Sequence, residues 1–179
     1  MLQLHIEVPD KWDPIKEEFI LTPAKDVQLE HSLISVVKWE SHYHKPFLRT
    51  QLTGEELLYY ISKCMCITKN VDEDIFKTMD RQYLEEVKNY IADPMTATPK
   101  LPGKEGTDTE MITNELIYYW MTQLSIPWEA ERWHLNRLMK LIELANYKNT
   151  PPEKRSKIDM AKSRREENDR RRALWKTKG

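Results

Sequence analysis

The start of the chain alternates between apolar and polar side chains, which is the pattern of half-buried β-strands. This alternation predicts strands over residues 2–8 and 17–21, separated by a proline-containing turn at 9–14, and a third strand over 27–29. These segments are enough for an antiparallel hairpin or a three-stranded sheet. Because such a small sheet is not stable alone, we expect a helix to cover it.

Apolar residues recur at helical spacing from about residue 31 onward. The first helix should end near Pro46, because the residue before a proline resists helical geometry. Its expected apolar stripe is Leu33, Ile34, Val37 and Trp39. This helix should pair with the next one along the chain.

Capping signals mark the starts of the next two helices. Thr53 and Glu56 have the spacing of a capping box and open a helix over 57–64. Asp72 can cap a short helix that reaches Phe76. The chain between residues 53 and 76 should therefore be mainly helical.

A further helix should run from Asp80 or Arg81 to Ile91 and stop at Pro94. The apolar face of this helix is Tyr83, Leu84, Val87, Tyr90 and Ile91. Residues 93–108 contain three prolines and two glycines, so they should form a long loop.

Two helices are expected after this loop. The first begins at Asp108 or Thr109, and its periodic apolar residues are Ile112, Leu116, Ile117, Trp120, Met121 and Leu124. Pro127 suits the first turn of the second, which should run to about Lys148. The apolar positions of the second helix are Leu135, Leu138, Leu141, Met139, Ile142, Leu144 and Ala145. The short junction at residues 125–126 should make the two helices an antiparallel hairpin.

The prolines at the end of residues 149–152 interrupt the helical pattern, and residues 154–175 contain good helix formers but few apolar side chains. We therefore expect a body over residues 1–148 and a basic helical arm within residues 149–179 that protrudes from it. The predicted fold class is α+β, mostly α, with a short N-terminal antiparallel β element on a helical bundle.

The net charge of -1 hides a division between these two parts. From Lys148 to Gly179 there are twelve Lys or Arg and five Asp or Glu, so the preceding residues carry about eight net negative charges. The N-terminus lacks the features of a secretory signal, and no apolar run is long enough to cross a bilayer. With Cys64 and Cys66 as its only cysteines, the chain fits a reducing cytoplasm.

The sequence favours no catalytic or metal site. His42 and His44, near His31 and Glu40, include metal-binding residue types, but no second cluster completes a ligand set, so packing at the end of a helix is favoured. With only four glycines, the chain scarcely offers a phosphate-binding loop, and its paired carboxylates suit a solvated helical surface. We expect a protein that is not an enzyme and needs no cofactor.

The residues that suggest partner binding lie in the last third of the chain. The aromatic cluster of this region contains Tyr118, Tyr119, Trp120, Trp128, Trp133 and His134. Two explanations remain open for it: core packing between two helices, and anchoring of a partner helix. The basic arm has three explanations: a solvated helix, a phosphate-binding element, and a segment that docks on a neighbouring copy or an acidic partner. The candidate partner-binding residues are Trp128, Trp133, His134, Asn136, Arg137, Arg170, Arg171, Arg172 and Trp175.

Several segments together resemble small tail assembly proteins of long-tailed bacteriophages, a group described as tail assembly chaperones. The segments that carry the resemblance are residues 30–47, 68–71, 93–98, 117–121, 126–129, 133–142 and 177–179. The resemblance implies a non-enzymatic protein that binds the tape measure protein in the host cytoplasm until tail tube subunits displace it. The resemblance carries no catalytic residues to transfer. Self-association is expected separately, because the body is acidic and the arm is basic.

Two other functions remain open. A structural protein of the virion tail or neck would use the arm to contact adjacent subunits, and its presence in purified particles would identify it. A nucleic-acid-binding protein would use Arg170, Arg171 and Arg172, and its affinity would fall steeply with salt.

Overall fold

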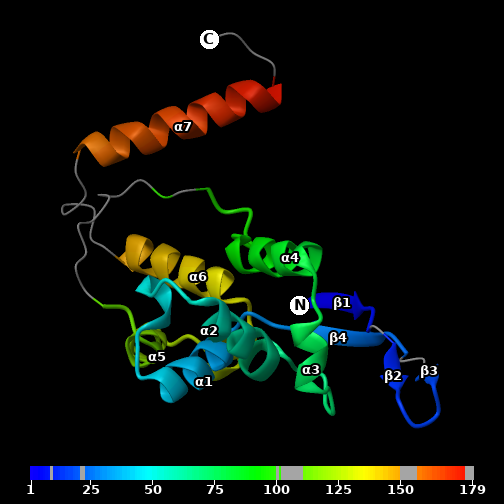
Figure 1. Ribbon diagram of the computed structural model, residues 1–179. Helices are drawn as coiled ribbons and strands as arrows, with labels where there is room; N and C mark the ends of the chain where they lie inside the picture. The colour runs from blue at the N-terminus through cyan, green and yellow to red at the C-terminus, as the bar shows by residue number, and fades with distance from the viewer. Residues whose placement is uncertain (9, 21–22, 100, 102–110, 150–156, 176–179) are drawn as a thin grey trace.

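The computed structural model describes residues 1–8, 10–20, 23–99, 101, 111–149 and 157–175. Helices make up 59% of the structure, and a short antiparallel sheet lies at the N-terminus. The predicted fold class, α+β and mostly α, is confirmed. Figure 1 shows the sheet at one end of a group of helices, with the last helix set apart from that group.

The N-terminal strands pair differently from the prediction. Strand β1 (Leu2–Ile6) pairs with β4 (Lys25–Leu29), while β2 (Lys11–Asp13) and β3 (Glu18–Ile20) form a separate hairpin. The predicted turn at 9–14 therefore contains a strand. The pairing of β1 with β4 follows from their matched alternation, because Leu4 lies opposite Val27 and both are buried.

Helix α1 (Leu33–Tyr43) begins at the N-cap Ser32 and ends at His44, whose φ of 54° stops the helix. The predicted stripe was partly wrong. Leu33 and Trp39 are buried as expected, but Val36 lies in the core instead of Ile34 and Val37, which are half-buried. The buried face also includes two polar residues, Ser35 and Glu40, which apolar periodicity does not reveal.

The next helices begin where the capping signals predicted. Thr53 and Glu56 form a complete capping box at the start of α2 (Gly54–Tyr59). Asp72 caps α3 (Glu73–Lys77), and Asp80 caps α4 (Arg81–Ala92). A 3₁₀ helix, η1 (Phe47–Arg49), precedes α2.

Helix α2 continues into a π-helical segment, η2 (Tyr60–Met65). A π turn is wider than an α turn, because its hydrogen bonds join residues five apart. The buried residues of this segment are Tyr60, Ile61, Cys64 and Met65. The segment packs against α1, as the predicted pairing of these two helices requires.

The two helices expected after the long loop differ from the prediction. Helix α5 (Asn114–Gln123) begins later than residue 109, and its N-cap Thr113 makes no side-chain capping bond. The expected helix from Pro127 to Lys148 is a 3₁₀ helix, η3 (Trp128–Arg132), followed by α6 (Leu135–Asn149). The break lies at Trp133 and His134, because His134 forms a β-bridge with Ser32. The simple helical hairpin was therefore wrong.

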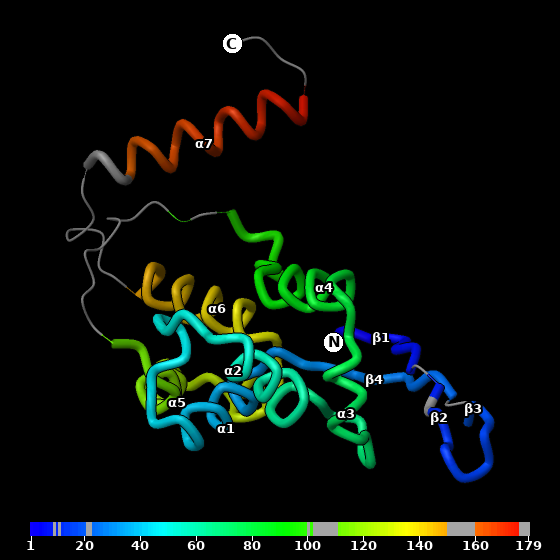
Figure 2. Tube along the Cα trace, viewed as in Figure 1, coloured from blue at the N-terminus to red at the C-terminus, as the bar shows by residue number. Residues whose placement is uncertain are grey.

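Helix α7 (Lys157–Trp175) corresponds to the predicted arm, and residues 154–156 and 176–179 lie outside the described part of the chain. In the Cα trace, α7 and the β2–β3 hairpin extend from different sides of the helical body (Figure 2). None of the helices in the described ranges combines the length and the apolar composition that crossing a bilayer requires.

Candidate partner-binding surface

The start of α6 binds the end of α4. His134 Nε2 lies 2.9 Å from the carbonyl oxygen of Tyr90, and Asn136 Nδ2 donates to the carbonyl oxygens of Ile91 and Asp93 at 2.9 and 2.8 Å. The last carbonyls of a helix have no partner within the helix, so these side chains satisfy them. Two of the predicted partner-binding residues thus use their polar atoms within the fold.

His134 belongs to a buried pair of histidines. Its Nδ1 accepts a hydrogen bond from the backbone N–H of Asn136, which leaves the proton on Nε2 to be donated to Tyr90. The ring of His31 lies 5.1 Å from that of His134, and its Nδ1 is 2.6 Å from the hydroxyl of Tyr60. Burial, and then the neighbouring His134, lower the pKa of His31 from 6.5 to about 3. His31 is therefore neutral at physiological pH.

Trp133 and Arg137 lie together on the surface. The guanidinium carbon of Arg137 is 4.6 Å from the centre of the Trp133 ring, which is a cation–π contact. Trp133 is half-buried, and Arg137 is exposed. Asn136 is also half-buried, but its side-chain amide is used at the end of α4, so Trp133 and Arg137 are the pair in the 133–137 segment whose exposed atoms are left for a partner.

Trp128 forms a second exposed aromatic site on η3. It is 59% exposed, and its ring lies 5.5 Å from the ring of Tyr118. The hydroxyl of Tyr118 donates to Glu131 at 2.9 Å, and burial together with this bond raises the pKa of Tyr118 to about 12. Tyr118 therefore stays protonated, and it holds Trp128 against the body without burying it.

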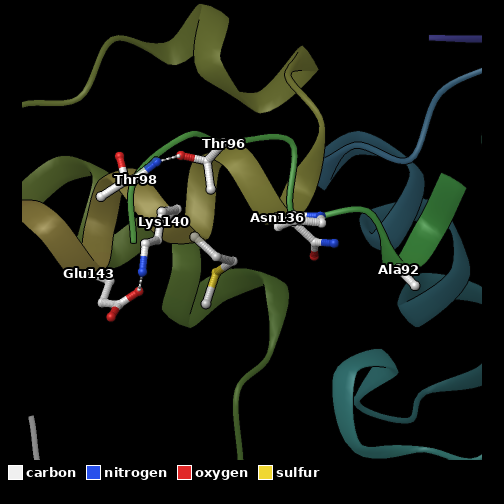
Figure 3. Close-up of a pocket in the computed structure, with 8 residues that line it drawn as sticks. Ala92, Thr96, Thr98, Asn136, Lys140 and Glu143 are labelled. Carbon is white, nitrogen blue, oxygen red and sulfur yellow. Dashed lines mark hydrogen bonds and ion pairs between the residues drawn. The ribbon is translucent and has the colours of Figure 1, made fainter. Parts of the chain in front are cut away.

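A pocket of about 580 Å³ lies between residues 92–98 and α6. Figure 3 shows Thr96 and Thr98 on one side and Lys140 and Glu143 on the other. Lys140 Nζ is 2.8 Å from Glu143, so the charges of this pair are mutually satisfied.

The remaining predicted residues lie on α7, apart from those of the body (Figure 1). Arg171 pairs with Glu167 at 3.1 Å and Arg172 with Asp169 at 3.8 Å, both within the helix. Trp175 is 74% exposed at the end of the helix. The nine predicted residues therefore lie in three places. His134 and Asn136 belong to the α4–α6 junction. Trp128, Trp133 and Arg137 lie on the surface of η3 and the start of α6, and the other four lie on the arm.

Sequence reasoning missed an apolar surface on the β2–β3 hairpin. Trp12 and Phe19 face each other across the hairpin with ring centres 5.0 Å apart, and Ile15 at its tip is 92% exposed. The Oδ1 of Asp13 accepts hydrogen bonds from the backbone N–H groups of Ile15 and Lys16, which fixes the turn. In the sequence, this surface is indicated by the spacing of Trp12 and Phe19 around a short polar turn. The segment that contains Trp12 was interpreted as a loop before a strand, so the hairpin was missed.

The histidines considered as metal ligands have other roles. His42 stacks on Tyr59 at 4.3 Å, and His44 forms the C-terminus of α1. Within the described residues, no group of three or more His, Cys, Asp or Glu side chains is arranged to hold a metal ion. Burial raises the pKa of the Cys64 thiol to about 11, so Cys64 is a poor nucleophile at neutral pH.

Comparison with known proteins gives no assignment, since no protein-family model, no curated protein and no solved structure matches the chain.

Proposed function

We propose that the protein is a non-enzymatic assembly factor of bacteriophage tails that binds the tape measure protein in the host cytoplasm during assembly of the tail tube. One structural observation supports a role in binding other proteins: large apolar side chains are exposed on the hairpin, on η3 and at the end of the arm. Exposed apolar groups of this kind mark surfaces that contact other proteins. The choice of partner comes from the resemblance to tail assembly proteins.

The surface around η3 suits a helical partner. Trp128 supplies a large apolar side chain, and Arg137 supplies a cation held over the Trp133 ring. An amphipathic helix with apolar residues on one face and a carboxylate nearby would contact both. Tape measure proteins are long and helical in the family that the chain resembles, so this chemistry fits the proposed partner.

Co-purification with the tape measure protein of the same phage tests this proposal. The full chain should retain the tape measure protein when the two are co-expressed. Arg137→Ala and Trp128→Ala should each weaken binding by at least about fivefold while leaving the fold intact. Arg81→Ala is the matched control, because Arg81 is exposed on α4. Unchanged binding in both test variants would exclude this surface, and no binding by the wild-type chain would exclude the proposed partner.

The main alternative is a permanent component of the virion tail or neck whose arm contacts adjacent subunits. Quantitative mass spectrometry of purified particles separates the two functions. Absence from particles, with the protein present in infected cells, would support an assembly factor. A fixed copy number matching a ring or tube would instead identify a structural protein.

Nucleic-acid binding is less well supported by the arm. Arg171 and Arg172 already lie near Glu167 and Asp169, and these carboxylates would oppose a phosphate backbone. A steep fall of affinity for DNA or RNA with salt, lost when Arg170, Arg171 and Arg172 are replaced, would favour this function over the proposed one.

A further inference from the structure

The β2–β3 hairpin combines exposed apolar side chains with an excess of negative charge. Residues 11–20, which form the hairpin, contain three Asp or Glu and two Lys. Glu17 is exposed and forms no ion pair with another described residue, and Glu18 is 3.9 Å from Lys16 in a solvated pair. Both carboxylates lie within two residues of Phe19, which is 65% exposed. The hairpin is therefore an acidic apolar projection.

The end of α7 has the opposite charge. Residues 170–175 contain three arginines and no Asp or Glu, and they end with Leu174 and Trp175, which are 73% and 74% exposed. Arg171 and Arg172 precede Trp175 by four and three residues, so they lie on the same side of the helix as its ring. These arginines also form solvated pairs with Glu167 and Asp169 within the helix, and exposed pairs of this kind are weak, so both guanidinium groups can contact another carboxylate. An apolar group and two cations therefore share one face at the end of the arm.

These two surfaces do not meet within one chain. Figure 1 shows the hairpin beyond the end of the β1–β4 sheet and the end of α7 on the other side of α4, with a wide separation in the plane of the view. Among the described residues, no extensive contact joins α7 to β2 or β3. Each copy thus presents both halves of a complementary pair, and neither half is covered by the other.

We propose that the end of α7 in one copy docks on the β2–β3 hairpin of a second copy. Trp175 and Leu174 would pack against Phe19 and Ile15, removing exposed apolar surface from water. Arg171 and Arg172 would approach Glu17 and Glu18, and the ring of Trp12 offers an arginine a second favourable contact through its face.

This contact is heterologous, because it joins different surfaces of the two copies. A heterologous contact generates a ring if its rotation closes and an open helical filament if it does not. Few side chains take part in each contact, so a single contact is weak and a dimer should dissociate on dilution. The proposal does not depend on the tape measure protein, because both surfaces belong to this chain.

Reciprocal charge reversal in the full chain tests the contact. One variant carries Glu17→Lys and Glu18→Lys, which makes both of its surfaces basic. The other carries Arg171→Glu and Arg172→Glu, which makes both of its surfaces acidic. Their masses are measured by sedimentation velocity and light scattering from about 1 to about 100 μM, the range expected for a weak interface.

The wild-type chain should associate as its concentration rises, and association should weaken between about 0.05 M and about 0.5 M NaCl, because salt screens exposed charges. Each variant alone should associate at least about tenfold more weakly, because like charges then meet. An equimolar mixture should recover association, since every arm then meets a hairpin of opposite sign. Recovery on mixing is not expected from a nonspecific loss of stability.

Two controls separate this contact from general effects of charge and of surface area. Glu85→Lys with Glu86→Lys makes the same charge change on α4 and should leave association unchanged. Trp175→Ala should weaken association, whereas Tyr119→Ala, which removes another exposed aromatic ring from α5, should not. Circular dichroism melts confirm that each variant is folded. A wild-type chain that stays monomeric, or a mixture that fails to recover association, would overturn the proposal.

Discussion

Replacing Glu40 with alanine should destabilise the fold more than any substitution of an exposed carboxylate. The Glu40 side chain is buried, and it caps two helices at once. Its Oε1 accepts a hydrogen bond from the backbone N–H of Phe47 at 2.7 Å, at the start of η1. Its Oε2 accepts from the backbone N–H and the side-chain amide of Asn114 at 2.8 and 2.7 Å, at the start of α5. Thr113 makes no side-chain capping bond, so Glu40 replaces it.

The size of the effect follows from the groups that lose their partner. Glu40→Ala leaves three donors without this acceptor, and a buried donor without a partner costs about 1–3 kcal/mol. A pocket of about 430 Å³ borders Glu40 and Asn114, so water can reach part of the site. The cost of each unpaired donor should therefore lie near the low end of this range. For the three donors together, we expect the free energy of unfolding to fall by about 4 kcal/mol. Glu40→Gln keeps one acceptor oxygen and should cost about half as much.

Urea denaturation of the full chain, followed by tryptophan fluorescence and far-UV circular dichroism, measures this loss. The control is Glu55→Ala, because Glu55 is exposed in the first turn of α2 and should contribute less than about 1 kcal/mol through the helix dipole. A loss for Glu40→Ala no larger than that of the control would refute the capping role. Since small domains are stable by about 5–15 kcal/mol, the variant should still fold but melt earlier.

Three further predictions follow from the same structure. The pKa of His31 is lowered from 6.5 to about 3 in the folded state, so its contribution to stability is complete above pH 6.5 and is lost as the pH falls toward 3. At about pH 5 this loss should be about 2 kcal/mol by urea denaturation, and His31→Gln should remove that part of the pH dependence. Truncation after Pro152 should leave a body with a cooperative melt, and loss of the cooperative melt would show that the arm belongs to the core. Iodoacetamide should label Cys66 before the buried Cys64 in the native chain, as peptide mass spectrometry can show, and equal labelling rates would contradict the assigned burial.

The elements that the sequence predicted well are those with local signals. The capping box at Thr53 and the caps at Asp72 and Asp80 lie where the structure has them, because a cap acts over three or four residues. Helix α5 was placed too early because its cap comes from Glu40, seventy-four residues away in the chain. A partner at that distance leaves no pattern near the helix that it caps.

The errors around residue 133 have the same cause. Periodicity alone favoured one helix from Pro127 onward, and it cannot detect the bridge between His134 and Ser32 that interrupts it. The hairpin was missed for a different reason. Its two strands are close in the sequence, but Trp12 lies in a segment rich in turn residues, which was interpreted as a loop. The separation of this hairpin from the other sheet also depends on the pairing of β1 with β4, which are distant in the sequence.

The segment from Trp133 to Arg137 combines two kinds of residue that the sequence could not separate. His134 and Asn136 satisfy the carbonyls at the end of α4, so their identity is explained by the fold. Trp133 and Arg137 stack on each other at the surface and make no comparable bond to another helix in the described part of the chain. The α4–α6 junction therefore accounts for the first pair, and the second pair is left for the proposed contact with a partner. For this reason the binding experiment replaces Arg137 and leaves His134 and Asn136 intact, since replacing either of those would disturb the fold and binding together.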